Sequence, residues 1–119
     1  MAIPLETLRR PADFAHLQQQ GISRAHPLVV VRVARNGLTS TRYAFATGRR
    51  LGGAVVRNRV RRRLREIVRS LACRVAPGWD VLIVARVPSV AASYAALRDV
   101  VARLLDRLGA LSGGGGCKG

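Results

Sequence analysis

The sequence contains few acidic residues, few aromatic residues and two cysteines, and these shortages exclude several kinds of protein. Six Asp and Glu stand against 21 Lys and Arg. They form no acidic cluster that could hold catalytic metal ions, which argues against a stand-alone nuclease. His16 and His26 have no carboxylate at a spacing that indicates a catalytic pair, and no serine has a plausible base. The sequence therefore predicts no catalytic residue and no metal site.

Long apolar segments are also absent. No apolar run reaches about 18 residues, the length at which a membrane helix is suspected. The first ten residues include Glu6 and lack the apolar core of a secretory signal. These absences predict a cytoplasmic protein, in which a disulfide between Cys73 and Cys117 is not expected. Cys73 is expected to be a buried or half-buried small apolar residue.

What the sequence has in excess is arginine. The formal net charge is +15, and Lys118 is the only lysine. A domain with this charge attracts polyanions, which in a cell are mainly nucleic acids and anionic membranes. A GC-rich genome would explain arginine in place of lysine, but it would not explain the net charge. Arginine also grips phosphate through a planar, bidentate fork, and this favours a nucleic acid as the partner.

The hydrophobic pattern predicts three helices and four strands. Helices are expected over residues 11–20, 54–74 and 94–108, with Ser93 as the N-cap of the last. Strands are expected over residues 22–25, 28–34, 40–47 and 80–86. Asn36-Gly37 predicts a hairpin between the second and third of these strands.

This order, α-β-β-β-α-β-α, indicates an α/β fold. We expect an α+β two-layer sandwich, in which helices cover mainly one face of a small, mostly antiparallel four-stranded sheet. Residues 9–109 then form a single domain. A flexible arm is expected at residues 1–8 and a Gly-rich flexible tail at residues 110–119.

The second predicted helix is amphipathic, with arginine on its polar side. At about 100 degrees per residue, five apolar side chains cluster on one side, from Val60 to Leu71. The opposite arc carries Arg61, Arg62, Arg65 and Arg69 together with Asn58. Arg57 falls inside the apolar sector at the first turn, where free backbone N–H groups and the helix dipole favour a phosphate.

A run of charge is usually a solvated helix face, but such a face normally mixes signs. Here nine arginines between Arg49 and Arg69 accompany one acid, Glu66. Like charges at i,i+4 cost roughly 0.2–0.5 kcal/mol per pair, so a helix that accepts this cost is expected to bind a polyanion. A membrane is the weaker candidate, because the apolar side is aliphatic, lacks Trp and is needed to cover the sheet.

The segment from Gly52 to Glu66 resembles the Arg-Asn-Arg signature of the protein subunit of bacterial ribonuclease P. Arg57-Asn58-Arg59 lies near its centre and Arg49-Arg50 precedes it. The resemblance covers about residues 8 to 108, because the predicted first helix and the strands after Pro27 and at 81–86 follow in family order. It implies a left-handed βαβ crossover in the fold. It also implies a cofactor for a catalytic RNA that removes the 5′ leader of precursor tRNA, with the RNA holding the magnesium ions that perform the chemistry.

The resemblance implies two RNA-binding surfaces and no catalytic residue in the protein, with no further protein partner required. The catalytic RNA should contact the signature loop and helix, namely Arg49, Arg50, Arg57, Asn58, Arg59, Arg61, Arg62 and Arg65, to which the helical pattern adds Arg69. The 5′ leader should lie in a cleft between the first helix and the sheet, with Phe14, Arg42, Phe45 and Arg86 as candidates.

Three positions depart from the family pattern. Gly53 replaces a common Asn before the helix, and Gln18 and Val31 replace aromatic residues, so base stacking in the cleft should be weaker or should rely on arginine planes. A ribosomal or other structural RNA-binding protein on a related small fold is the alternative reading.

Overall fold

The computed structural model describes residues 5–111 of the chain; residues 1–4 and 112–119 lie outside this description. The described part contains five strands, β1 (Glu6–Thr7), β2 (Ile22–Ala25), β3 (Val29–Arg35), β4 (Arg42–Thr47) and β5 (Trp79–Ala85). Its α-helices are α1 (Pro11–Gln20), α2 (Ala54–Leu71) and α3 (Tyr94–Arg107), and short 3₁₀ turns cover Arg49–Leu51, Ala72–Arg74 and Val87–Val90. The predicted helices and the four predicted strands are all present, with boundaries shifted by a few residues. Ser93 Oγ accepts a hydrogen bond from Ala96 N (3.1 Å), which confirms the predicted N-cap.

The sheet has the strand order β1-β4-β5-β3-β2. β1 with β4 and β4 with β5 are parallel pairs, whereas β3 is antiparallel to both β5 and β2. The predicted class, a mixed fold of three helices and a small sheet, is confirmed. The prediction of a mostly antiparallel four-stranded sheet is wrong in two details, because the sheet has a fifth strand and half of its pairings are parallel.

The predicted hairpin at Asn36-Gly37 is also wrong, because β5 lies between β3 and β4. Gly37 has a positive φ of 72°, as a tight turn requires. However, the turn is hydrogen-bonded to residues at the start of β5. Asn36 N donates to Gly78 O (2.9 Å), and Asn36 Nδ2 donates to Asp80 Oδ1 (3.0 Å). Local sequence identifies a turn, but the partner of each strand depends on which apolar strands pair over their whole length.

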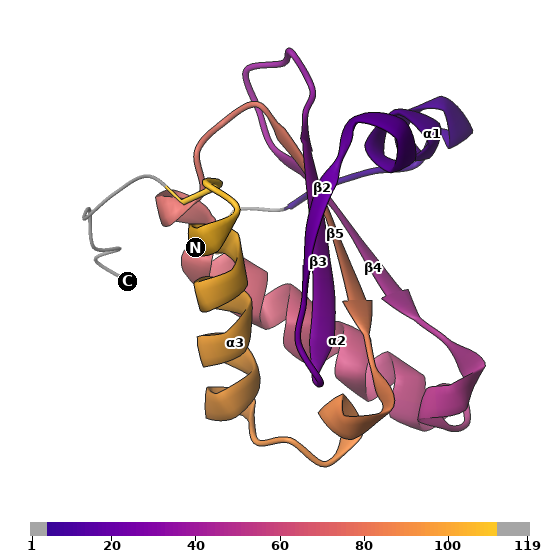
Figure 1. Cartoon of the computed structure of the whole chain (residues 1–119). Helices are drawn as coiled ribbons and strands as arrows, with labels where there is room; N and C mark the ends of the chain where they lie inside the picture. The colour runs from indigo at the N-terminus through magenta and orange to yellow at the C-terminus, as the bar shows by residue number, and fades with distance from the viewer. Residues whose placement is uncertain (1–4, 112–119) are drawn as a thin grey trace.

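The parallel neighbours β4 and β5 are joined through α2, so the structure contains the βαβ crossover that the family resemblance implies. The crossover has a direct consequence for the arginine-rich segment. It holds α2 against one face of the sheet and places the basic loop before α2 at the carboxyl end of β4 (Figure 1).

The helices lie on both faces of the sheet (Figure 1). α2 and α3 cover one face, where Val31, Val81 and Ile83 pack against Leu64 and other apolar residues of the two helices. α1 lies on the opposite face, in a smaller cluster around Leu17. The expected two-layer sandwich therefore gains a partial third layer.

The chain ends and Cys73 differ from expectation. Residues 1–8 were predicted to be a flexible arm, but Glu6–Thr7 pairs with β4 and Leu8 is buried. Of the predicted tail, Ala110 is buried and Leu111 forms a β-bridge with Val75, while 112–119 lie outside the described residues. Cys73 was expected to be a buried or half-buried residue without a disulfide, but it is exposed and disulfide-bonded. Cys117, the other cysteine of that expectation, lies outside the described residues. Among residues 5–111, no helix is long and apolar enough to cross a membrane.

Candidate nucleic-acid interface

The arginine side of α2 is exposed over most of its length. Val60, Leu64, Ile67, Val68 and Leu71 are buried against the sheet and α3, as the helical pattern predicted. On the outer side Asn58, Arg59, Arg62, Arg65 and Arg69 are exposed, and Arg61 is half-buried. We call these six residues the arginine face. Its single acidic neighbour in α2 is Glu66, so the face presents a nearly uniform positive charge.

The arginine face is hollowed into a groove of about 510 Å³. Four of the six residues that line it are arginines, and the others are Asn58 and Val55. Val55 is 81% exposed, which leaves an apolar surface at the N-terminal end of the groove. Guanidinium groups around a groove suit a phosphate backbone, and a nearby apolar contact suits a sugar or a base.

Arg61 is held in a fixed position within this groove. Its Nη2 donates to Thr47 Oγ1 at the end of β4 (2.6 Å), and its Nη1 donates to Asn58 Oδ1 (2.9 Å). These bonds explain why Arg61 is less exposed than the helical pattern predicted. Asn58 thus orients an arginine through its oxygen, and its amide N–H₂ group remains available as a donor toward a ligand.

Arg57 lies at the first turn of α2 and is half-buried, which agrees with its place in the apolar sector. Its Nε atom is buried without a hydrogen-bond partner among the described residues. The helix begins after Gly53, which supplies no side-chain cap, so the first-turn N–H groups are not occupied by a capping oxygen. The replacement of Asn by Gly at this position therefore leaves these donors for an anion.

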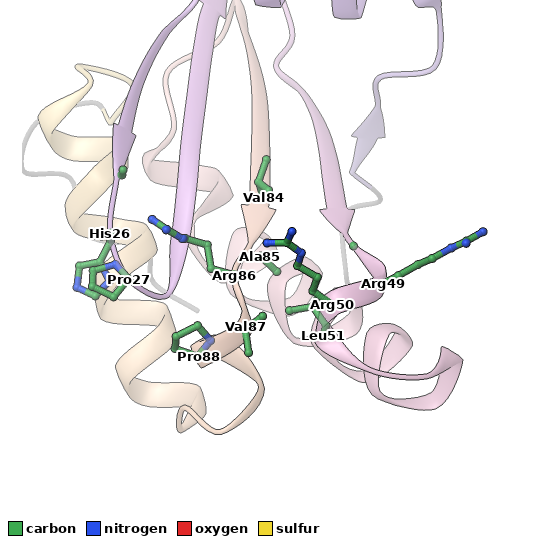
Figure 2. A pocket seen from close by; sticks show the side chains of 12 residues that line it. His26, Pro27, Arg49, Arg50, Leu51, Val84, Ala85, Arg86, Val87 and Pro88 are labelled. Carbon is green, nitrogen blue, oxygen red and sulfur yellow. The ribbon is translucent and has the colours of Figure 1, made fainter.

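A second concavity, of about 780 Å³, lies where β3 begins and β5 ends (Figure 2). Leu51, Val84, Ala85, Val87 and Pro88 give it an apolar lining. Arg49, Arg50, Arg86 and His26 supply its polar groups. Figure 2 shows the Arg49 side chain pointing away from Arg50 and Arg86. We call this concavity the sheet-end pocket.

Sequence reasoning identified the arginines of this pocket but missed His26, Leu51, Val87 and Pro88. The missing information was the antiparallel register, in which Val29 pairs with Ala85. That register brings the residues before β3 beside those after β5. The prolines that bound these strands marked both ends, but no local signal showed that the two ends meet.

The four candidates for the leader cleft do not form one site. Phe14 is half-buried beside α1's contact with the sheet, and Arg86 is exposed at the sheet-end pocket. Phe45 packs on the opposite side of the sheet, in the core under α2, so its assignment to the cleft is wrong. It alternates with Ala44 and Ala46, which face α1's side.

The guanidinium group of Arg42 donates hydrogen bonds to carboxylates of the protein itself. Its Nε and Nη2 atoms donate to the two carboxylate oxygens of Asp80 (2.9 and 2.8 Å), and its Nη1 donates to Asp13 of α1 (3.1 Å). The Asp80 hydrogen bonds and the two carboxylate charges raise the pKa of the Arg42 guanidinium above its ordinary value. Arg42 therefore links α1 to the sheet, and its charge is compensated.

The departures at Gln18 and Val31 have different consequences. Val31 is fully buried in the core between the sheet and α2 and α3, so it does not reach the cleft. Gln18 is exposed on α1, and its carbonyl accepts a hydrogen bond from Arg32. Only the change at Gln18 removes a ring from the α1 side of the sheet.

Comparison with known proteins agrees with this geometry. The Ribonuclease P family model matches residues 4–109, which is nearly the whole described chain. The chain belongs to the Ribonuclease P family. It is 40% identical over 107 residues to the ribonuclease P protein component of Roseiflexus castenholzii, covering 89% of this chain and 88% of that protein. It is 43% identical over 105 residues to that of Symbiobacterium thermophilum, covering 87% and 91% of the two chains.

Solved structures of the family share the fold. The RNase P protein of Staphylococcus aureus superposes with a TM-score of 0.81 at 22% identity, over 92% of this chain and 100% of that chain. The RNase P protein from Thermotoga maritima gives a TM-score of 0.77 at 27% identity, over 86% and 96%. The resemblance found in the Arg57-Asn58-Arg59 segment therefore extends to the whole domain.

Proposed function

We propose that this chain is the protein component of a ribonuclease P ribonucleoprotein, and that it assists removal of the 5′ leader from precursor tRNA in the cytoplasm. The observation that carries the proposal is the arginine face, exposed on α2 of a chain that belongs to the family. A face with one acid among its arginines is suited to a dense polyanion, and a folded catalytic RNA provides one.

The two concave surfaces serve two RNA segments. The groove of the arginine face, with Arg59, Arg62 and Arg65, binds the catalytic RNA through its phosphates. The sheet-end pocket takes the single-stranded leader, because it combines an apolar lining with the cations Arg50 and Arg86, and single strands bind to such surfaces.

An apolar strip crosses the sheet between this pocket and α1. Ala25, Val30, Val84 and Ala46 are cross-strand neighbours on β2, β3, β5 and β4 and form the strip. Val30, Val84 and Ala46 are half-buried and lie on the face that α1 covers at its other end. The leader then lies along this strip, with Arg50 and Arg86 of the sheet-end pocket on one side of it and α1 on the other. Few aromatic rings are available there, so binding depends more on arginine and on apolar contact than on stacking.

In this proposal the chemistry is performed by the catalytic RNA and the magnesium ions that it holds. The protein contributes positive charge and orientation. Neutralising phosphates at the interface lowers the repulsion between two RNA molecules, and this effect is largest when few divalent ions are present.

Reconstitution tests the proposal directly. The purified protein is mixed with a bacterial ribonuclease P RNA at low magnesium, and labelled precursor tRNA is supplied. Cleavage at the mature 5′ end is expected from the mixture, with none from the protein alone. An RNA-binding protein without this role would bind the RNA and leave the cleavage rate unchanged, and that result would exclude the proposal.

A further inference from the structure

α1 is attached to the sheet by a small apolar interface. Leu17 is the one buried residue among its ten, and Phe14 is half-buried beside it. The sheet offers Ala34, Ala44 and the half-buried Leu82 at this contact, and Leu8 is buried beside them. With one buried and one half-buried apolar side chain of its own, a ten-residue helix gains limited stabilisation from this contact. The position of α1 therefore depends on other contacts as well.

Arg42 on β4 holds the first turn of α1. Its guanidinium bridges Asp13 of α1 and Asp80 of β5, which is 1% exposed. The side chains of Arg42 and Asp13 are 20% and 22% exposed, so solvent screens this ion pair less than a surface pair. Asp13 also lies in the first turn of the helix, where a negative charge is favourable.

Arg32 on β3 holds the last turn of α1. Its Nε donates to Leu17 O (2.9 Å) and its Nη2 to Gln18 O (2.6 Å), two carbonyls at the helix end. Gly21 makes this approach possible, because a Cβ at that position would lie 2.2 Å from Leu17 O and 3.0 Å from Arg32 Nε. Arginines from two different strands therefore fix the two ends of α1.

We propose that Arg42 and Arg32, together with Asp13, are positioning residues that set where α1 stands beside the leader-binding strip. This inference rests on the proposed function. Both guanidinium groups direct hydrogen bonds to protein atoms at the α1 end of the sheet, whereas Arg50 and Arg86 lie at the opposite end. A shift of α1 changes the surface on which the leader lies, and small misplacements in a binding site weaken binding strongly.

Replacing Asp13 with alanine distinguishes a positioning role of this residue from an effect of net charge alone. Asp13→Ala raises the net charge by one, from +15 to +16, and so should strengthen RNA binding if charge alone matters. If Asp13 positions α1, the same change should weaken leader binding. Asp99→Ala is the matched control, because it makes the same charge change and also breaks an arginine ion pair, on the exposed side of α3.

The experiment uses the holoenzyme reconstituted with ribonuclease P RNA and two substrates, one with a multi-nucleotide leader and one with a single-nucleotide leader. For Asp13→Ala the preference for the long leader should fall about fivefold, through KM rather than kcat. Asp99→Ala should keep the wild-type preference. Affinity for the catalytic RNA should not fall in either variant, because the arginine face is on the other side of the sheet.

A conservative variant gives the second measurement. Asp13→Glu keeps the charge and should restore most of the leader preference, while Asp13→Asn, which still accepts a hydrogen bond, should lose less than Asp13→Ala. An unchanged or stronger leader preference in Asp13→Ala would overturn the inference. So would a parallel loss of affinity for the catalytic RNA, which would indicate general damage to the fold. A wild-type protein that gives no stimulation would instead refute the proposed function itself.

Discussion

Replacing Arg62 and Arg65 together with alanine should weaken binding to the catalytic RNA and make it less sensitive to salt. Both side chains are exposed and line the groove of the arginine face. Within residues 5–111 neither forms an internal hydrogen bond or ion pair, unlike Arg61, which is tied to Thr47. The double variant therefore removes positive charge from the groove without removing a polar contact inside the protein.

The size of the effect follows from counterion release. Each phosphate neutralised by the protein contributes about 0.7 to the log–log salt slope for single strands and about 0.9 for duplex. If each arginine meets one phosphate, the slope should become shallower by about 1.4 to 1.8. Between about 50 and 200 mM salt, the wild-type protein should then lose about tenfold more affinity than the variant.

The assay is fluorescence anisotropy of labelled ribonuclease P RNA, titrated with protein at a series of monovalent salt concentrations. The control is Arg103→Ala with Arg107→Ala, two exposed positions on α3. Both double variants lower the net charge by two, from +15 to +13. The control should keep the wild-type slope. Equal flattening in both variants would show that total charge matters and the arginine face does not; no flattening in either would show that the face is merely solvated.

Three further predictions concern stability, each measured by urea unfolding. Leu64→Ala should lower the free energy of unfolding by about 2–5 kcal/mol, because the Leu64 side chain is fully buried against the sheet. Val55→Ala, at an exposed position of the same helix, should lower it little. Similar losses in the two variants would mean that α2 is oriented differently. Gly21→Ala should lower the free energy of unfolding by about 1–3 kcal/mol, because the added Cβ would collide with Leu17 O. A Cβ at Gly53 would have no atom within 4 Å, so Gly53→Ala should change this free energy by less than about 1 kcal/mol. Burial raises the pKa of Tyr43 from 10.0 to about 12, so the folded state holds its proton more tightly than the unfolded state. Stability should then decline by about 2 kcal/mol as pH rises from about 10 to 12, and Tyr43→Phe should remove this decline; an equal decline in the variant would exclude Tyr43 as its cause.

The amphipathic character of α2 could be read from sequence because it depends on neighbours within one helix. The spacing of Val60, Leu64 and Leu71 fixed which side would be buried, and seven of the other positions of the helix carry arginine whatever the rest of the fold does. The structure confirmed this division and corrected Arg61 alone, which bonds to Thr47 on a distant strand. The signature around Asn58 also gave the family, since it is a property of the order of residues.

The neighbours of each strand could not be read in the same way. Asn36-Gly37 predicts a turn correctly, but the long-range pairing of β3 with β5 decides that β4 is not its partner. The same pairing creates the sheet-end pocket, and the alternation of β4 then places Phe45 in the core and Arg42 on the side of α1. A shift of one residue in strand register would move each of these side chains to the other face of the sheet. No local sequence pattern specifies that register.

The sequence by itself determined the charge, the helical arginine face, the mixed class and the family, because these depend on composition and on short spacings. Tertiary structure alone decided that arginines divide into two groups with different tasks. Apart from Arg61, the arginines of the arginine face are exposed, as are those of the sheet-end pocket. In contrast, Arg42 and Arg32 donate hydrogen bonds to carboxylates and carbonyls that fix α1. The physical reason is that an arginine's role depends on whether a buried acceptor lies within reach, and acceptors such as Asp80 and Leu17 O come within reach only when distant segments fold together.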